Sequence, residues 1–370
     1  MQKLLIAGIS LVAGFSFADP LDHWTRTNVG APVILRGVAY GNGRWVTVGD
    51  NGSIFYSSNA LSWSRAQSSA VGSIRALTFG NGRFVAVEGA NYENFHMFLT
   101  SNDGTHWVRT PSDLRFENVV FGRGLFIAAN PDYVIATSTD GTDWRFEGVQ
   151  SGAMAIGVSD SLFLSAWYAT YASSTGTNWT FLAPPPNAYS AFARMAYGNG
   201  TFFALAVRAS STEVCYTTVD GSQWTPGETF PRGFNWGDVV FAHDTFAIAG
   251  DTGAIYTSTM GTNWVERVPG QFYTDRFATL TYGNGRLAAV GGDGIVIVSD
   301  HYGPPVLKIS KTPDLRLNVS AEKDKLCIVE QSEDLLHWSE VTRYTNSAET
   351  VEITALSPTN AAAVFRVRTD

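Results

Sequence analysis

Short apolar runs alternate with polar turn residues along most of the chain, and this pattern predicts strands rather than helices. Hairpins stand out where Asn-Gly separates two runs rich in Val, Thr, Phe and Tyr, the strongest short signal for a tight β-turn. They are Tyr-Gly-Asn-Gly-Arg at 40–44, Phe-Gly-Asn-Gly-Arg at 79–83, Tyr-Gly-Asn-Gly at 197–200 and Tyr-Gly-Asn-Gly-Arg at 282–286. Degraded copies occur at 121–124, 158–161 and 241–244. We therefore expect a hairpin of one kind to recur seven times.

A second motif follows each hairpin by about 20 residues and ends in tryptophan. Its copies are SSNALSW (57–63), SNDGTHW (101–107), STDGTDW (138–144), SSTGTNW (173–179), TVDGSQW (218–224) and STMGTNW (258–264). Asp and Ser side chains can bond nearby backbone amides, Gly can take a left-handed conformation, and Trp can pack between neighbouring sheets. The tryptophans run from Trp24 to Trp264 in six steps of about 40 residues. This period predicts an all-β fold, a seven-bladed β-propeller with four short strands per blade.

The first and last repeats are incomplete, and each contains what the other lacks. Residues 21–27 predict a fourth strand without the three that precede it, whereas residues 276–299 predict three strands without a fourth. Together they make one composite blade, in which the N-terminal strand closes the ring non-covalently.

The Trp-ending motif resembles the Asp-box of sialidase-like propellers, which lies between the third and fourth strands of a blade. Over residues 19–303 the chain is also similar to the propellers of the photosystem II assembly-factor family and of exported bacterial proteins. The resemblance implies a fold, and it implies that the motif supports folding, because Asp-boxes lie away from the catalytic face. It does not imply sialidase activity, because the FRIP motif of that family is absent and no Tyr and Glu align with its nucleophile pair.

The N-terminal residues predict export. Lys3 precedes an apolar run from Leu4 to Phe17, and the small residues Ser16 and Ala18 stand before Asp19, the pattern of a signal peptide at 1–18 cleaved after Ala18. A first buried strand or helix is the alternative. No other segment is long and apolar enough for a membrane span. The mature protein is therefore expected to be secreted or periplasmic.

A smaller domain is expected at the C-terminal end. Tyr-Gly-Pro-Pro at 302–305 ends the repeats, and alternating apolar and polar runs within 304–370 predict a small β-sandwich. It is similar to fibronectin type III or immunoglobulin-like modules, and it serves as a spacer, a stabilising addition or a separate ligand site. Cys215 and Cys327 fall in different domains, so two free buried thiols are expected rather than a disulfide.

Composition narrows the class of partner. The 370 residues include 25 basic and 33 acidic ones, and the net charge of −8 argues against nucleic acid as a partner. The histidines show no paired metal-ligand spacing, so neither a metal nor another cofactor is expected. Candidate functional residues are therefore expected on the face of the ring.

Five arginines lie near the predicted first strands, which line the central channel of a propeller. They are Arg36, Arg75, Arg115, Arg194 and Arg276. Strand alternation, counted from the hairpin, puts four of them on one side of their strands and Arg194 on the other. Two interpretations stay open, a ring that binds an anion or partner, and a set of salt bridges between blades.

Aromatic residues in the longer connections of blades two to five predict a wall beside the channel mouth. The candidates are Tyr92, Phe95, His96, Tyr133, Trp167, Tyr168 and Tyr171, with Trp236 from the sixth blade. Such a wall suits sugars or peptides, and packing against adjacent blades is the alternative.

Glu117 and Asp238 are the acids that fall within predicted first strands, so they are the candidates for glycan chemistry. Their blades lie nearly opposite in the ring, which argues against a two-carboxylate mechanism. The sequence favours an exported, non-catalytic binding or assembly module that engages a glycan or protein partner through its Arg- and aromatic-lined face. A glycoside hydrolase or polysaccharide lyase is the alternative, and a purely structural role is the third interpretation.

Overall fold

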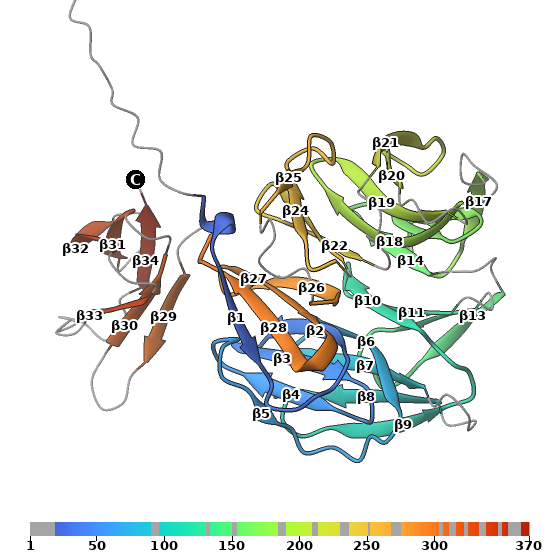
Figure 1. The fold of residues 1–370 in the computed structure, drawn as a ribbon, viewed down its shortest axis with the longest axis horizontal. Helices are drawn as coiled ribbons and strands as arrows, with labels where there is room; N and C mark the ends of the chain where they lie inside the picture. The colour runs from blue at the N-terminus through green and yellow to red at the C-terminus, as the bar shows by residue number, and fades with distance from the viewer. Residues whose placement is uncertain are drawn as a thin grey trace, which may run out of the picture.

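The fold is an all-β propeller of seven blades in the part of the chain that is described, as the repeat predicts (Figure 1). The structure, a computed structural model, describes residues 19–89, 96–130, 134–149, 154–183, 190–208, 214–229, 237–250, 252–267, 275–302, 306–310, 316–321, 325–332, 338–346, 350–353 and 364–369. The first strands of successive blades contact one another around a ring, and the last of them, β26 (Phe277–Gly283), contacts β2 (Leu35–Gly41). The central channel is therefore bounded by one strand from every blade.

Six blades are antiparallel meanders of strands in sequence order. Blades 1 and 2 comprise β2, β3 (Arg44–Gly49), β4 (Ile54–Ser57) and β5 (Ser64–Arg65), then β6 (Ser73–Gly80), β7 (Arg83–Gly89), β8 (His96–Ser101) and β9 (Val108–Ser112). Blades 3 and 4 comprise β10 (Asn118–Gly122), β11 (Leu125–Ala129), β12 (Val134–Ser138) and β13 (Arg145–Val149), then β14 (Ala155–Val158), β15 (Phe163–Ala166), β16 (Thr170–Ser173) and β17 (Thr180–Ala183). Blades 5 and 6 comprise β18 (Ser190–Gly198), β19 (Thr201–Arg208), β20 (Val214–Thr218) and β21 (Thr225–Thr229), then β22 (Asp238–Ala242), β23 (Thr245–Ala249), β24 (Ile255–Ser258) and β25 (Val265–Glu266).

The seventh sheet joins the two ends of the repeat region. It contains β26, β27 (Arg286–Gly291), β28 (Ile295–Ser299) and β1 (Trp24–Asn28), with the short 3-10 helices η1 (Pro20–Asp22) and η2 (Gly292–Gly294) beside it. β1 pairs antiparallel with β28, from Trp24 opposite Ser299 to Asn28 opposite Ile295. Arg26 also donates two hydrogen bonds to Asp275, at 2.8 and 3.1 Å. The N-terminal strand is thus held by a backbone ladder and by a forked ion pair.

The hairpin motif has the conformation its sequence predicts. Asn42 and Gly43 have φ values of 49° and 73°, as a two-residue turn between twisted strands requires. The glycine before this turn has another role, because a Cβ on Gly41 would lie 2.2 Å from the ring of Phe79 in the next blade. A Cβ on Gly283 would meet Tyr40 at the same distance, so the contact also joins blade 7 to blade 1.

The core lies between the blades. Trp107 packs with Val46 of blade 1 and Phe84 of blade 2, and Trp224 packs with Leu164 of blade 4 and Phe202 of blade 5. The prediction that these tryptophans pack between neighbouring sheets is therefore confirmed.

The C-terminal residues form two three-stranded sheets in the part of 306–369 that is described. One contains β29 (Val306–Ser310), β30 (Arg316–Ser320) and β33 (Thr350–Ile353), and the other β31 (Leu326–Ser332), β32 (Ser339–Thr345) and β34 (Val364–Thr369). Cys215 and Cys327 are both buried thiols that form no disulfide, as expected. No helix among the described residues has the length and apolar character needed to cross a membrane.

Candidate functional site

A cavity of about 480 Å³ lies where the first strands of all seven blades meet. Its polar lining comes from Arg36, Arg75, Glu117, Arg194 and Asp238, together with Asn118 and several threonines. The side chains converge because every blade contributes residues of its first strand, or of the chain just before it, to the lining. The cavity therefore brings together three of the five predicted arginines and both predicted acids.

Blades 1 to 3 supply one group of charged side chains at the cavity. Arg36 donates two hydrogen bonds to Asp50, at 2.5 and 3.0 Å, and Arg75 lies 3.9 Å from Glu117 of the next blade. Burial raises the pKa of Asp50, but bonds from Arg36 and Ser73 and the charges of Arg36 and Arg75 outweigh it, so this pKa lies below its ordinary value. The Asp50 carboxylate is therefore held ionised among cationic groups.

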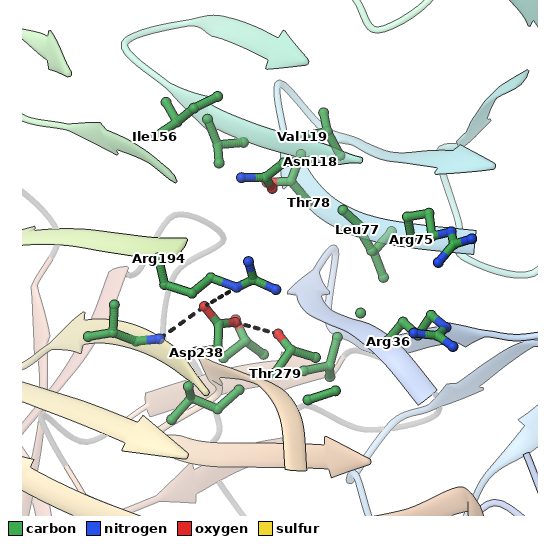
Figure 2. A pocket seen from close by; sticks show the side chains of 18 of the residues that line it. Arg36, Arg75, Leu77, Thr78, Asn118, Val119, Ile156, Arg194, Asp238 and Thr279 are labelled. Carbon is green, nitrogen blue, oxygen red and sulfur yellow. Dashed lines mark hydrogen bonds and ion pairs between the residues drawn. The ribbon is translucent and has the colours of Figure 1, made fainter. Parts of the chain in front are cut away.

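Blades 5 to 7 supply a second group, which lies apart from Arg36 and Arg75 (Figure 2). Arg194 lies 3.5 Å from Asp238. Asp238 also accepts hydrogen bonds from the hydroxyl of Thr279 at 2.6 Å and from the amide of Val239 at 2.9 Å. Each group thus joins side chains of neighbouring blades. The salt bridges of the second interpretation are present, and the same three arginines line the cavity, which leaves binding of an anion or partner there a prediction.

The expectation that Arg194 faces away from the other arginines is wrong. The pairing of first and second strands shifts register between Leu35 and Gly37, between Ile74 and Ala76, and between Phe192 and Arg194. A bulge inserts one residue and re-aims the side chains beside it, so simple alternation fails there. Arg36 and Arg75 are the inserted residues and Arg194 follows one, which explains why all three reach the cavity.

Two other arginines were expected on the cavity side, and neither lines it. Arg115 is exposed and donates from Nε to Oε1 of Glu117 at 2.5 Å. Arg276 is exposed, and its backbone carbonyl accepts a bond from Gly292 at 3.0 Å. Both precede the regular part of their first strands, which explains why they lie outside the cavity lining.

The predicted aromatic wall is described only in part. Tyr92, Phe95, Tyr133 and Trp236 lie outside the described residues. His96 begins β8 and is half-buried, whereas Trp167 and Tyr168 lie in the turn between β15 and β16, their rings edge to face at 5.1 Å. Tyr171 packs against Phe181 of its own blade. None of these four lines the cavity, and Tyr168, at 58% exposed, is the one most open to a ligand.

Sequence reasoning missed Asn118, Met154 and Thr279, which also line the cavity. Counting back from the residue that opens each hairpin finds Met154 and Thr279, and Asn118 directly follows Glu117. The position four residues earlier holds Arg36, Arg75, Glu117 and Met154 in blades 1 to 4, and the position three residues earlier holds Arg194, Asp238 and Thr279 in blades 5 to 7. An alignment of the seven repeats on this residue contains the signal.

Glu117 and Asp238 are each engaged by basic or hydroxyl side chains. Glu117 contacts Arg75 and Arg115, and Asp238 contacts Arg194 and Thr279. They come from blades 3 and 6, separated by two blades of the ring. This arrangement suits carboxylates that position arginines better than a pair that shares acid-base work across one glycosidic bond.

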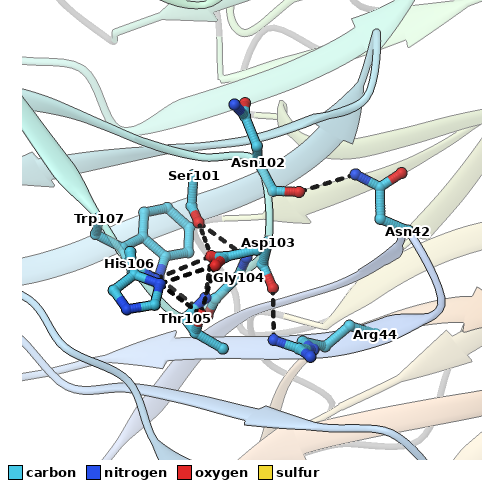
Figure 3. A network of polar contacts seen from close by, with 9 residues as sticks. All are labelled: Asn42, Arg44, Ser101, Asn102, Asp103, Gly104, Thr105, His106 and Trp107. Carbon is cyan, nitrogen blue, oxygen red and sulfur yellow. Dashed lines mark hydrogen bonds and ion pairs between the residues drawn. The ribbon is translucent and has the colours of Figure 1, made fainter.

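The Trp-ending motif forms a turn that is bonded within itself (Figure 3). Oδ1 of Asp103 accepts from the amides of Thr105 and His106, at 2.8 and 2.9 Å, and the hydroxyl of Ser101 accepts from Gly104 at 2.8 Å. Burial raises the pKa of Asp103, but hydrogen bonds from His106 and Thr105 outweigh it and hold the pKa well below its ordinary value.

The same turn is bonded to the hairpin of the preceding blade. Nδ2 of Asn42 donates to the carbonyls of Gly82 and Asn102, at 2.9 and 2.8 Å, and Arg44 donates to the carbonyl of Asp103 at 2.8 Å. The next pair of blades repeats the contact through Asn81 and Arg83. The two sequence motifs are therefore the two halves of one latch between blades. No cluster of metal-ligating side chains occurs among the described residues.

Comparison with known proteins identifies the fold. No protein-family model and no curated protein matches the chain. Among solved structures the chain is similar to YCF48 from Cyanidioschyzon merolae, with 12% identity, a TM-score of 0.59 and coverage of 75% of this chain and 98% of that one. It is also similar to virginiamycin B lyase from Staphylococcus aureus, with 13% identity, a TM-score of 0.61 and coverage of 75% and 99%. A catalytically inactive form of that lyase with quinupristin gives 13% identity, a TM-score of 0.62 and coverage of 75% and 98%. These likenesses establish a shared fold.

Proposed function

We propose that the protein is an exported, non-catalytic binding or assembly module that holds an anionic group of a glycan or protein partner in its central cavity. The observation that carries this proposal is the set of three guanidinium groups, those of Arg36, Arg75 and Arg194, around one cavity. Guanidinium groups bind carboxylates and phosphates through paired N–H donors. Tyr168 at the same end of blade 4 offers an exposed ring against which a sugar or an apolar side chain can pack.

The pairing of the two acids supports binding over turnover. Glu117 and Asp238 hold Arg75 and Arg194 within contact distance, and so orient the guanidinium groups. A hydrolase or lyase at this site would instead need one of these carboxylates to exchange protons with the substrate. The neighbour named as a lyase shares only 13% identity, so its activity is not carried over to this chain.

We further propose a location and a domain plan. Residues 1–18 act as a signal peptide, so the protein is secreted or periplasmic. Residues 19–303 form the propeller, and residues 304–370 form a small β-sandwich that serves as a spacer. This sandwich is similar to fibronectin type III or immunoglobulin-like modules. The two three-stranded sheets support the sandwich, and the pairing of β1 with β28 supports closure of the ring by the N-terminal strand. The bonds of Asp103 within its turn support the likeness to the Asp-box.

An array of acidic and neutral oligosaccharides, polysaccharides and acidic peptides, read for both retained binding and released products, tests the function. We expect binding of acidic members without product release. Arg75→Ala and Arg194→Ala should each weaken binding about tenfold or more, because each removes a charge-assisted donor. Arg65→Ala, on the outer strand β5, is the matched control and should bind as the wild type does.

Two results would overturn the proposal. Product release that disappears in Glu117→Gln or Asp238→Asn would make the protein a glycan-active enzyme. Undiminished binding in both arginine variants would move the site away from the cavity.

A further inference from the structure

The residue that follows each hairpin turn differs between blades in a way that creates a second cavity. The turn is followed by arginine in blades 1, 2 and 7, by leucine in blades 3 and 4, and by threonine in blades 5 and 6: Arg44, Arg83, Leu125, Leu162, Thr201, Thr245 and Arg286. Threonine is the shortest of the three side chains. Blade 5 therefore lacks the long side chain that covers this place in blades 1 and 2.

In blades 1 and 2 the arginine contacts its own third strand or the turn that follows it, and it also reaches the next blade. The guanidinium of Arg44 stands 5.0 Å from the ring centre of Tyr56 and donates to the carbonyl of Asp103 at 2.8 Å. Arg83 donates to the side chain of Asn102 at 3.0 Å and to the carbonyl of Asp140 at 2.8 Å. The guanidinium thus bridges two blades by donating to turn oxygens.

Blade 5 has a hollow at the corresponding place. A cavity of about 330 Å³ is lined by Thr201, Thr217, Thr218, Val219, Asp220, Ser222, Gln223 and Thr225. Counted back from the motif tryptophan, Thr217 occupies the position of Tyr56, and Val219 occupies the position of Asn102. The cavity therefore lies at the position that the side chains of Arg44 and Arg83 occupy in blades 1 and 2.

The lining of this cavity is rich in hydrogen-bond acceptors. It contains five hydroxyl groups, one amide side chain and the carboxylate of Asp220. Ser222 donates to Oδ1 of Asp220 from its amide at 2.9 Å and from its hydroxyl at 2.7 Å. These bonds from Ser222 hold the pKa of Asp220 below its ordinary value, so the cavity carries a negative charge at neutral pH.

The rim adds apolar surface and a further acceptor. Val219 and Met260 are 74% and 62% exposed, which offers contact to the methylene stem of a long cationic side chain. A Cβ on Gly261 would lie 3.5 Å from Thr217, so the turn of blade 6 lies beside the cavity. Met260 of that turn holds the position of Asp103 and Asp140, whose carbonyls accept from Arg44 and Arg83.

We propose that this cavity in blade 5 is a binding site for a guanidinium group supplied from outside the chain, chiefly an arginine side chain of a protein partner. The incoming group takes the place that Arg44 and Arg83 occupy in their own blades. A planar fork of five N–H donors matches the turn carbonyl, the carboxylate and the hydroxyls better than an ammonium does. Hairpins and Trp-ending turns lie at the opposite end of the blades from the strand starts that line the central cavity, so the two sites are separate.

Binding of short synthetic probes to the purified protein tests the site. The probes are an acetylated and amidated Gly-Arg-Gly peptide, its Gly-Lys-Gly counterpart and agmatine, each titrated by NMR or calorimetry. We expect the arginine peptide to bind at least about fivefold more tightly than the lysine peptide, since the fork is lost in lysine. Binding of agmatine without the arginine peptide would assign the site to a free guanidino compound instead of a protein arginine, and would overturn that part of the proposal.

Thr201→Arg is the decisive variant, because it restores the Asn-Gly-Arg sequence of blades 1 and 2 and fills the cavity from within. We expect it to abolish binding of the arginine peptide and to raise the thermal midpoint. Thr245→Arg is the matched control, with the same substitution at the same position of blade 6, and should bind as the wild type does.

Asp220→Asn keeps the site testable if Thr201→Arg misfolds. Asparagine already stands at this position in blade 1, where Asn59 accepts bonds from the amides of Leu61 and Ser62, both at 3.0 Å. This variant should retain the turn and weaken binding of the arginine peptide about fivefold, as loss of one exposed charge pair does. No binding of any probe to the wild type, or equal binding to Thr201→Arg, would overturn the proposal. So would unchanged binding to Asp220→Asn.

Discussion

At the residue scale, the glycine before each Asn-Gly turn leaves room for an aromatic side chain of the next blade, because it has no Cβ. Gly41 has no side chain where the ring of Phe79 lies, and Gly80, Gly198 and Gly283 repeat this with the aromatic residue of the next blade. The aromatic residue that opens one hairpin thus packs on the backbone of the hairpin before it. Tyr-Gly or Phe-Gly before the turn therefore predicts a contact between neighbouring blades.

This contact predicts a steric effect of one methyl group. Gly41→Ala should lower the free energy of unfolding by about 2–3 kcal/mol, because the ring of Phe79 has to move aside. Gly89→Ala is the control, since a Cβ there meets no atom within 4 Å, and its effect should be under about 1 kcal/mol. Urea unfolding measures both. Equal losses would show that the contact with Phe79 is not the cause.

At the element scale, the latch between a hairpin and the next Trp-ending turn ties neighbouring blades together. The latch depends on carboxylates, because Asp103 and Asp140 each organise a turn that the preceding blade contacts. Hydrogen bonds from Thr142 and Asp143 hold the pKa of Asp140 well below its ordinary value, as those of His106 and Thr105 do for Asp103.

These carboxylates predict a dependence of stability on acid. A carboxylate whose pKa is lower in the folded chain stabilises the fold above its unfolded pKa of 3.8, and this contribution is lost as the pH falls toward the folded pKa. The double variant Asp103→Asn and Asp140→Asn keeps the acceptor oxygen, as Asn59 does in blade 1, and removes the titration. The wild type should therefore lose more stability than the variant between about pH 5 and pH 2. Thermal midpoints across this range measure it, and parallel curves would contradict it.

At the scale of the whole molecule, blade 7 joins β1 to the strands at the end of the repeat region. β1 is bonded to β28 along its length, and Arg26 is bonded to Asp275, whose side chain is only 4% exposed. Arg267 holds the preceding turn through Asp19 and Asp22, at 2.8 and 3.0 Å. The proposed closure thus combines backbone pairing with three ion pairs made by two arginines.

The closure predicts where the molecule opens first. Arg26→Met leaves the buried Asp275 without its forked partner and should lower the free energy of unfolding by about 2–4 kcal/mol. Amide hydrogen exchange should accelerate first in β1 and β28, because blade 7 is the sheet built from both ends of the repeat region. Arg65→Met, on the exposed strand β5, is the control. Faster exchange spread evenly over all blades would contradict closure at this sheet.

The seven-bladed propeller could be predicted from the sequence, because local chemistry encodes it. Asn-Gly specifies a hairpin through positive φ values, and a Trp-ending turn every forty residues or so marks one blade after another. The same repeats identified Arg36, Arg75, Glu117 and Asp238 as residues near the channel. Each of these signals lies within a few residues of chain.

Which side chains share a cavity depends on the folded arrangement of the blades and could not be predicted from the sequence. The side of the strand on which the Arg194 side chain lies depends on a bulge, and a bulge exists only in the pairing of one strand with another. The cavity beside Thr201 depends equally on the turn of the next blade, which lies against it. Both cases have one cause: a conformation set by neighbours along the chain can be predicted from the sequence, whereas a side chain's surroundings are set by residues of other strands and blades, which only folding brings beside it.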